Sequence, residues 1–246
     1  MSIDLKDRIA LVTGASRGIG YFTALELAKA GAHVIACART VGGLEELDDA
    51  IQAAGGSATL VPFDLADMAA IDKLGGSIFE RWGKLDILIA NAGMLGVISP
   101  IDHVEAKVFE KVMNINVTAT WRLIRSVAPL LLKSDAGRAV LLSSSAAHKC
   151  KPFWGPYSAS KAAVEALART WAGETQRTAL RITSFDPGGT RTAMRAQAIP
   201  GEDPSTVQHP SEVAKAILPL VARDYAETGK LFDMRQGRLV DYRLPD

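Results

Sequence analysis

The stretch "RIALVTGASRGIG", residues 8–20, decides the fold of this chain. Its first part, residues 8–13, is a short apolar run typical of a buried strand. Glycines follow at positions 14, 18 and 20, and a helix-like pattern continues to residue 30. A glycine-rich turn between a strand and a helix exposes free N–H groups at the positive end of the helix dipole. The stretch therefore predicts an α/β fold with an anion-binding turn after its first strand.

Short apolar runs alternate with longer helix-like segments along the rest of the chain. The runs rich in Val, Ile and Leu lie at residues 8–13, 32–38, 58–63, 85–90, 138–143, 180–185 and 230–234. The helix-like segments lie at residues 18–30, 41–54, 67–82, 102–133, 156–178 and 211–223. Strands that are apolar on both faces and alternate with helices indicate a parallel sheet covered on both sides. We expect a single doubly wound α/β domain over residues 1–246, with about seven strands.

The composition limits the kinds of protein this can be. The 246 residues are 48% hydrophobic, and 28 Lys and Arg oppose 27 Asp and Glu, which gives a net charge of +1. This balance argues against nucleic acid or an anionic membrane as the main partner. The chain begins with the charged "MSIDLKDR" and contains no apolar run near the ~20 residues that span a bilayer. Its two cysteines, Cys37 and Cys150, have no metal-ligand or redox spacing. We expect a soluble, cytoplasmic protein without a metal site.

The glycine turn has the spacing G-x-x-x-G-x-G. One glycine permits a tight exit from the strand, and another lets the backbone approach a pyrophosphate. We therefore expect a dinucleotide to bind this turn, through Gly14, Ser16, Arg17, Gly18, Ile19 and Gly20. A glycine-rich turn without a ligand is the simpler alternative.

The end of the second strand indicates which dinucleotide binds. An NAD site normally has Asp or Glu there, which accepts hydrogen bonds from the adenosine ribose. Here the strand ends in "CART", with Ala38 at that position and Arg39 after it. Arg39 and Arg17 could pair with a 2′-phosphate, and this favours NADP(H) over NAD(H). The alternative is that both arginines lie on the surface without a ligand.

The next two strand ends carry further candidate cofactor contacts. Asp64 and Leu65 lie in "FDLAD" after the third strand, where Asp64 could reach the adenine edge or could cap the next helix. The sequence "NAG" follows the fourth strand. In it, Asn91 could hold the turn, and small residues up to Gly93 would let backbone and cofactor approach closely.

The stretch "WGPYSASKAAVEAL", residues 154–167, places Tyr157 and Lys161 four residues apart. Side chains at this spacing lie one turn apart on the same face of a helix. An ammonium group near a phenol favours the phenolate and lowers a pKa that is otherwise about 10. The alternative is an ordinary pair of surface residues, because the pattern is common by chance.

Taken together, these motifs resemble the short-chain dehydrogenase/reductase family, in its single-domain branch. The resemblance covers nearly the whole chain and rests on "TGASRGIG", "NAG", "INV" at 115–117, the serines at 143–145, "YSASK" and "DPGGTRT". The string "PGGTRTAMRA" resembles a bacterial branch of oxidoreductases whose substrate is unassigned. The resemblance implies a Rossmann fold, NADP(H)-dependent hydride transfer between nicotinamide and a carbonyl or secondary alcohol, and a homodimer or homotetramer.

The resemblance also implies roles for the tyrosine and the lysine. Tyr157 would be the general acid and base that exchanges a proton with the substrate oxygen. Lys161 would lower the pKa of Tyr157 and hold the ribose hydroxyls of the nicotinamide half of the cofactor. "DPGGTRT" would wrap the nicotinamide, through Pro187, Gly188, Thr190 and Thr192.

Two further catalytic positions follow from the resemblance, each with an alternative. The family serine, which hydrogen-bonds the substrate oxygen, corresponds by spacing to Ser144, and Ser145 is the alternative. The family asparagine, which extends a proton relay from the lysine, corresponds to Asn116. Asn114 stays open as an alternative on a different face of the helix.

Substrate recognition is expected in the loop at about residues 189–210 and in the turn at 94–101. Four residues could form an apolar lid: Met94, Leu95, Met194 and Ile199. Arg191 and Arg195 could attract an anionic group or could simply be solvated. His148, Phe153 and Trp154 could line the pocket or pack elsewhere.

Several functional alternatives stay open at this point. A non-catalytic dinucleotide-binding sensor or scaffold would keep the fold, although the complete set of catalytic residues favours an enzyme. Among enzymes, a 3-oxoacyl thioester reductase and a broad carbonyl reductase are not distinguished. Nucleotide-sugar epimerases and dehydratases share the Tyr–Lys pattern but need a longer C-terminal substrate region. The C-terminal "FDMRQGRLVDYRLPD" departs from the family's frequent V-D-G-G ending, which leaves the packing there open.

Overall fold

One mostly parallel sheet of eight strands organises residues 3–242, the part of the chain that the computed structural model describes. The strands are β1 (Ile9–Thr13), β2 (His33–Ala38), β3 (Ser57–Pro62), β4 (Ile87–Ala90), β5 (Arg138–Leu142), β6 (Arg181–Asp186), β7 (Lys230–Asp233) and β8 (Arg238–Val240). Their order across the sheet is β3-β2-β1-β4-β5-β6-β7-β8. The seven strands from β1 to β7 are parallel, as expected.

The eighth strand was not expected from the sequence. A turn in which Gly237 has a φ of +63° reverses the chain after β7. β8 then pairs antiparallel with β7, with Leu231 opposite Val240. β8 therefore covers an edge of β7 that would otherwise leave backbone groups unpaired.

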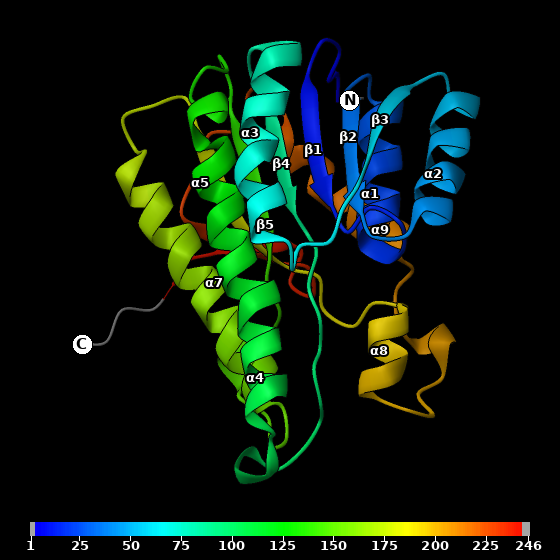
Figure 1. Ribbon diagram of the computed structural model, residues 1–246, viewed down its shortest axis with the longest axis vertical. Coiled ribbons are helices and arrows are strands. Elements are labelled where there is room, and N and C mark those ends of the chain that lie inside the picture. The colour runs from blue at the N-terminus through cyan, green and yellow to red at the C-terminus, as the bar shows by residue number, and fades with distance from the viewer. Residues whose placement is uncertain (1–2, 243–246) are drawn as a thin grey trace.

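Helices cover both faces of the sheet (Figure 1). They are α1 (Gly18–Lys29), α2 (Val41–Ala53), α3 (Met68–Trp82), α4 (Ala106–Met113), α5 (Ala119–Leu131), α6 (Ala146–Lys149), α7 (Gly155–Glu174), α8 (Ala193–Ala198) and α9 (Pro210–Ile217). Short 3₁₀ turns lie at Ile101–His103, Pro204–Thr206 and Leu218–Val221. The expected segment 102–133 is divided, because a π-helical turn at Asn114–Thr118 separates α4 from α5. Among residues 3–242, no helix is both long enough and apolar enough to cross a bilayer.

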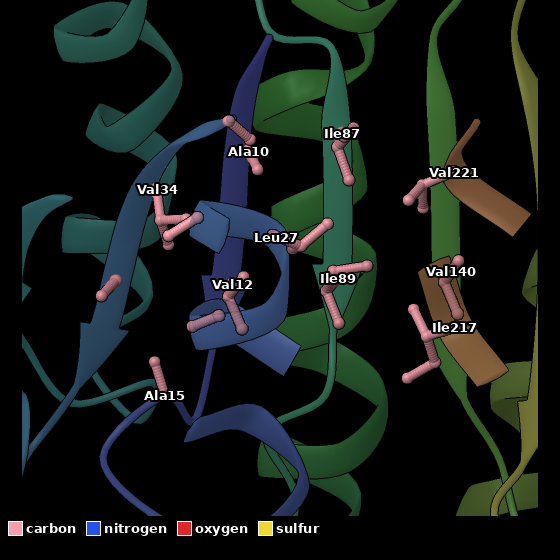
Figure 2. Close-up of a cluster of buried hydrophobic side chains, with 14 of the residues drawn as sticks. Ala10, Val12, Ala15, Leu27, Val34, Ile87, Ile89, Val140, Ile217 and Val221 are labelled. Atoms are coloured by element: carbon pink, nitrogen blue, oxygen red, sulfur yellow. The ribbon is translucent and has the colours of Figure 1, made fainter. Parts of the chain in front are cut away.

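The core forms two layers because successive residues of a strand point to opposite faces of the sheet. In β1, Ala10 and Val12 join Leu27 of α1 in the layer shown in Figure 2. Leu11, between them, packs in the other layer with residues of α3, α5 and α7. Each fully buried Leu or Ile contributes about 1.5–3 kcal/mol relative to the exposed side chain. Two apolar faces explain why the strands read as continuous apolar runs.

The strand order places the functional edge of the sheet. β1 lies between β2 and β4, so the chain crosses from one side of β1 to the other after β3. Loops that leave the carboxyl ends of β1 and β4 therefore diverge, and in open α/β sheets the ligand crevice lies at this point. The glycine turn follows β1, and "NAG" follows β4.

Candidate active site

The glycine turn after β1 is built to let backbone segments approach one another. Gly14 and Gly18 have φ angles of +68° and +58°, in the left-handed region that favours glycine. A Cβ on Gly20 would lie 2.5 Å from Asn91 Nδ2 and still closer to the carbonyl oxygen of Gly14. Within the described residues, no side chain caps the N-terminus of α1, where Arg17 is the extended N-cap residue. The first N–H groups of α1 are thus free for an anionic ligand.

Asn91 holds this turn in place, as the sequence suggested. Its Nδ2 donates to the carbonyl oxygen of Thr13 at 2.8 Å. In return, the hydroxyl of Thr13 accepts from the backbone N–H groups of Asn91 and Ala92, both at 3.1 Å. The ends of β1 and β4 are therefore tied together, which fixes the floor of the crevice.

Arg39, after β2, has a counterion that the sequence analysis did not anticipate. Its Nη1 lies 3.6 Å from Asp64 Oδ2, and both side chains are largely exposed, so the pair is weak. The alternative that Asp64 caps the next helix is wrong, because Asp67 is the N-cap of α3 and accepts from Ala70 N at 3.0 Å. Leu65 is partly buried and packs against the core layer of α3 and α5.

Asn116 is buried in the π-helical turn and makes three side-chain hydrogen bonds. Its Oδ1 accepts from Met94 N at 2.8 Å, and its Nδ2 donates to Met94 O at 2.9 Å and to Ser160 Oγ at 2.9 Å. It joins the loop after β4 to α7. Asn114, the alternative, is exposed. A Cβ on Gly93 would lie 3.2 Å from Asn116 Oδ1 and 3.7 Å from Lys161 Nζ, so the loop passes directly over the lysine.

Tyr157 and Lys161 lie one turn apart on α7, and both are buried. The Lys161 ammonium donates to the carbonyl oxygen of Leu142 at 2.6 Å and lies 5.7 Å from the centre of the Tyr157 ring. Ser144, in the turn after β5, lies close enough to Tyr157 to act on the pKa of its hydroxyl. The structure thus brings together the expected serine, tyrosine and lysine, while Ser145 begins α6 as its N-cap residue.

The expectation that Lys161 lowers the pKa of Tyr157 is wrong for this structure. Burial raises the pKa of Tyr157 to about 12, because the phenolate would lose its hydration, and the Ser144 hydroxyl opposes this only in part. Burial also lowers the pKa of Lys161 to about 8, against the opposing effect of the Glu165 and Asp186 carboxylates. The Lys161 ammonium donates to Leu142 O, and it is not among the groups that shift the pKa of Tyr157. Tyr157 is therefore neutral at physiological pH and able to donate its proton.

The loop after β6 closes the site from the other side. Thr190 is buried and donates its hydroxyl to Pro187 O at 3.2 Å. Thr192 caps α8 by accepting from Arg195 N at 3.2 Å, and its Cγ2 lies 3.4 Å from where a Cβ of Gly18 would be. The expected segment from Pro187 to Thr192 therefore reaches back to the glycine turn.

Helix α8 supplies an apolar wall beside the tyrosine. Met194 and Ala198 of α8, together with Trp154, pack against a small buried cluster of Leu95, Ala146 and Tyr157. The Trp154 and Tyr157 rings meet edge to face, with centres 6.0 Å apart.

Other expected pocket residues have different partners. Arg195 is engaged by Glu202, with Nε 2.6 Å from Oε2 and Nη2 2.5 Å from Oε1, so it is not a free site for an anion. His148 hydrogen-bonds Glu165 on α7, and Phe153 is 54% exposed. Ile199 lies outside the cluster of Tyr157 among the described residues.

The sequence analysis missed two buried carboxylates close to the site. Asp186 ends β6, accepts from Gly188 N at 3.0 Å and faces Arg235 Nη2 at 3.4 Å. Glu165 lies one turn after Lys161 on α7. Each had a usable signal: an acid directly before Pro-Gly at the end of a strand, and an acid four residues after the lysine.

The chain resembles known proteins over nearly its whole length. A family model described as short chain dehydrogenase matches residues 8–203. YciK of Escherichia coli K12, an uncharacterized oxidoreductase, is 40% identical over 238 residues, which span 95% of this chain and 94% of that protein. A short chain dehydrogenase from Shigella flexneri, complexed with NADP, has a TM-score of 0.91 and 39% identity, covering 96% of this chain and 100% of that one. Another, from Escherichia coli CFT073 complexed with NADPH, has a TM-score of 0.91 and 39% identity, covering 95% and 98%.

Proposed function

The chain belongs to the short-chain dehydrogenase family of oxidoreductases, and on that premise we propose that it transfers hydride between NADP(H) and a carbonyl or secondary alcohol substrate. The observation that carries the proposal is the convergence of Ser144, Tyr157 and Lys161 at the carboxyl ends of the strands, beside the glycine turn. The NADP and NADPH bound to two similar structures support the choice of cofactor.

The residues of the crevice fit a dinucleotide. A glycine cradle with no room for side chains and an uncapped helix N-terminus suit a pyrophosphate, which the backbone from Ser16 to Gly20 would hold. Arg17 and Arg39 are exposed and suit a 2′-phosphate. Asp64 and Leu65 would lie along the adenine, and the segment from Pro187 to Thr192 along the nicotinamide. When bound, the reduced nicotinamide supplies the hydride.

Tyr157 is the proposed proton donor in carbonyl reduction. Its high pKa keeps the hydroxyl protonated at neutral pH, so it can donate to a carbonyl oxygen as negative charge develops there. Ser144, close to Tyr157, offers a second donor to the same oxygen. The Lys161 ammonium, 5.7 Å from the centre of the Tyr157 ring, is the nearby cation that would stabilise the phenolate left by proton donation. Asn116 holds the loop at Met94 over this group of residues.

The substrate is proposed to carry an apolar group next to its carbonyl. Met194, Ala198 and Trp154 form the wall beside Tyr157, and the guanidinium of Arg195 is neutralised by Glu202. This wall would accept an acyl chain or a ring. A 3-oxoacyl thioester reductase and a broad carbonyl reductase both fit such a wall. A panel of acetoacetyl thioesters, aliphatic ketones, aromatic aldehydes and quinones tests which of these two activities the protein has.

The test follows NADPH consumption by the absorbance of the reduced nicotinamide. Tyr157→Phe and Ser144→Ala should each lower turnover at least 100-fold while NADPH still binds, because general acid catalysis contributes about 10²–10⁴ in rate. Ser145→Ala is the matched control and should keep most of the activity. Full turnover by Tyr157→Phe would refute the proton-donor role. Binding of NADPH without turnover of any compound in the panel would instead favour a sensor or scaffold.

Arg39 provides the test of cofactor choice. Arg39→Asp should weaken NADPH binding and leave NADH binding nearly unchanged, because only NADPH carries the 2′-phosphate. Titration of each cofactor by its fluorescence measures both affinities. Equal losses for the two cofactors would remove Arg39 from the phosphate site.

A homodimer or homotetramer is also proposed. Phe109 of α4 and Trp121 of α5 are 40% and 45% exposed, and exposed large apolar side chains on these two successive helices favour contact with a second copy. Trp121→Glu should shift the sedimentation coefficient toward that of a monomer. An unchanged sedimentation profile would exclude this face as the interface.

A further inference from the structure

Behind the active site lies a cluster of polar groups that the proposed chemistry does not use. Its members are buried, except for one histidine that reaches solvent. Its centre is Glu165, whose side chain is only 4% exposed. Oε1 accepts from the hydroxyl of Ser143 at 2.5 Å, and Oε2 lies 2.9 Å from Nε2 of His148, whose side chain is 49% exposed. The cluster therefore connects α7 to the end of β5 on one side and to solvent through α6 on the other.

Glu165 and Lys161 are the buried charged residues of α7 within the part of the chain described. They are four residues apart, so their side chains leave the same face of the helix. A buried carboxylate is costly unless it is paired or hydrogen-bonded. Glu165 has one neutral donor, Ser143, and one partner that can carry charge, His148. Two cations lie one turn from it on its own helix, Lys161 and Arg169, and of these only Lys161 is buried.

Other charged and titratable groups face this cluster from every element packed against it. Asp186, at the end of β6, acts on Lys161 and on Glu165. Tyr242, after β8, packs its ring 6.2 Å from that of His148, and the guanidinium of Arg169 lies 4.6 Å from the Tyr242 ring centre. Tyr242, in the segment where the sequence departs from the frequent family ending, thus packs against the histidine of this cluster.

We propose that Glu165 is a positioning residue of the active site, which keeps the buried Lys161 ammonium charged from behind, while His148 holds the carboxylate by a hydrogen bond from the solvent side. This inference rests on the proposed function, because the charge on Lys161 matters only if Tyr157 passes through a phenolate. Two carboxylates, Glu165 and Asp186, then support one ammonium that would otherwise lose its proton on burial.

The titration behaviour of Lys161 agrees with this arrangement. Burial lowers the pKa of Lys161 to about 8, and Glu165 is the largest influence that raises it again. Burial raises the pKa of Glu165, while the bond from Ser143 and the charge of His148 oppose that change. Lys161 acts in its protonated form, so activity is present below its pKa and is lost as the pH rises through it. Loss of the Glu165 charge should move this alkaline limit to lower pH.

A purely structural role for Glu165 would be to anchor Ser143. Three variants separate this anchoring role from the proposed effect of the Glu165 charge on Lys161. Glu165→Gln keeps the side-chain volume and an oxygen that accepts from Ser143, but removes the charge. Ser143→Ala removes the hydrogen bond and keeps the charge. Glu165→Asp keeps the charge and withdraws it by one methylene, and it serves as the test if the glutamine variant fails to fold.

The Lys161 titration is measured directly by NMR on protein in which lysine Cε is isotopically labelled, with Lys161→Met to assign its signal. Glu165→Gln should lower the Lys161 midpoint by about one pH unit or more, as expected for loss of a nearby opposite charge. Glu165→Asp should lower it less, and Ser143→Ala should leave it in place. In each variant, the pH at which kcat/KM for NADPH-dependent reduction falls on the alkaline side should shift by as much as the Lys161 midpoint of that variant.

Each outcome has a distinct meaning. An unchanged Lys161 midpoint in Glu165→Gln overturns the proposal, and so does an equal shift in Ser143→Ala, which would mark a structural effect. If Glu165→Gln does not fold, an unchanged midpoint in Glu165→Asp overturns it instead. A shifted midpoint in a protein that reduces nothing in the panel would count against the proposed function while supporting the effect of Glu165 on Lys161.

Discussion

Asn116 gives the sharpest test of how the active site is assembled. Its side chain makes three hydrogen bonds, two to the backbone of Met94 and one to the hydroxyl of Ser160. Asn116→Ala removes all three and leaves buried groups without partners. At about 1 kcal/mol for each bond, the loss is about 3 kcal/mol. The better helix propensity of Ala returns about 0.5 kcal/mol, so we expect a net loss of about 2.5 kcal/mol.

Thermal unfolding measures this loss. For a chain of this size, 1 kcal/mol corresponds to about 2–4 °C in Tm, so Asn116→Ala should lower Tm by about 5–10 °C. Asn114→Ala is the matched control, two residues earlier in the same π-helical turn and exposed. It should leave Tm unchanged or raise it slightly. If the two variants melt within about 1 °C of each other, the hydrogen bonds of Asn116 do not support the loop as argued.

Three further predictions follow from close contacts in the fold. Gly75→Ala in α3 would place a Cβ 2.9 Å from Ser126 Oγ and should lower the free energy of unfolding by about 1–3 kcal/mol. Its control is Gly76→Ala, whose Cβ would meet no atom within 4 Å among the described residues and which should raise the free energy of unfolding by about 0.5–1 kcal/mol. Chemical denaturation measures both values. Gly20→Ala should weaken NADPH binding in a fluorescence titration by displacing the turn at Asn91, and unchanged affinity would contradict the cradle. Glu202→Gln frees Arg195 of α8 and should raise the KM for apolar carbonyls more than it lowers kcat. If the variant has the same KM and kcat as the unmodified protein, the Arg195–Glu202 pair does not hold the apolar wall of α8 in place.

The order of elements could be predicted from the sequence because the central strands β1, β2, β4, β5 and β6 are buried on both faces. β1 and β2 read as continuous apolar runs and fall within one residue of the expected bounds. Helices α6 and α8 were missed, because a helix of four or six residues is too short to show a helical period. The π-helical turn was missed for a related reason: its i to i−5 bond, from Ala119 N to Asn114 O, inserts one residue without changing the apolar pattern.

The candidate site was predictable where its residues are close in sequence. Tyr157 and Lys161 share one helical turn, so their spacing alone places them side by side. The partners of the lysine come from elsewhere: Leu142 from β5 and Asp186 from β6. No spacing rule joins residues on different strands, because their distance depends on how the sheet is ordered. The pairing of Arg195 with Glu202 was not expected either, because Glu202, seven residues later, reaches Arg195 only after the loop folds back.

The sequence by itself determined the parallel sheet, the glycine turn and the tyrosine–lysine pair, because strand burial, backbone freedom and helical spacing are local properties of the chain. Only the tertiary structure decided the protonation of that pair. A pKa depends on hydration and on the charges nearby, and both are set by which strands and helices enclose the group. Burial outweighs the hydroxyl of Ser144 at Tyr157, and two carboxylates from different elements act together on Lys161.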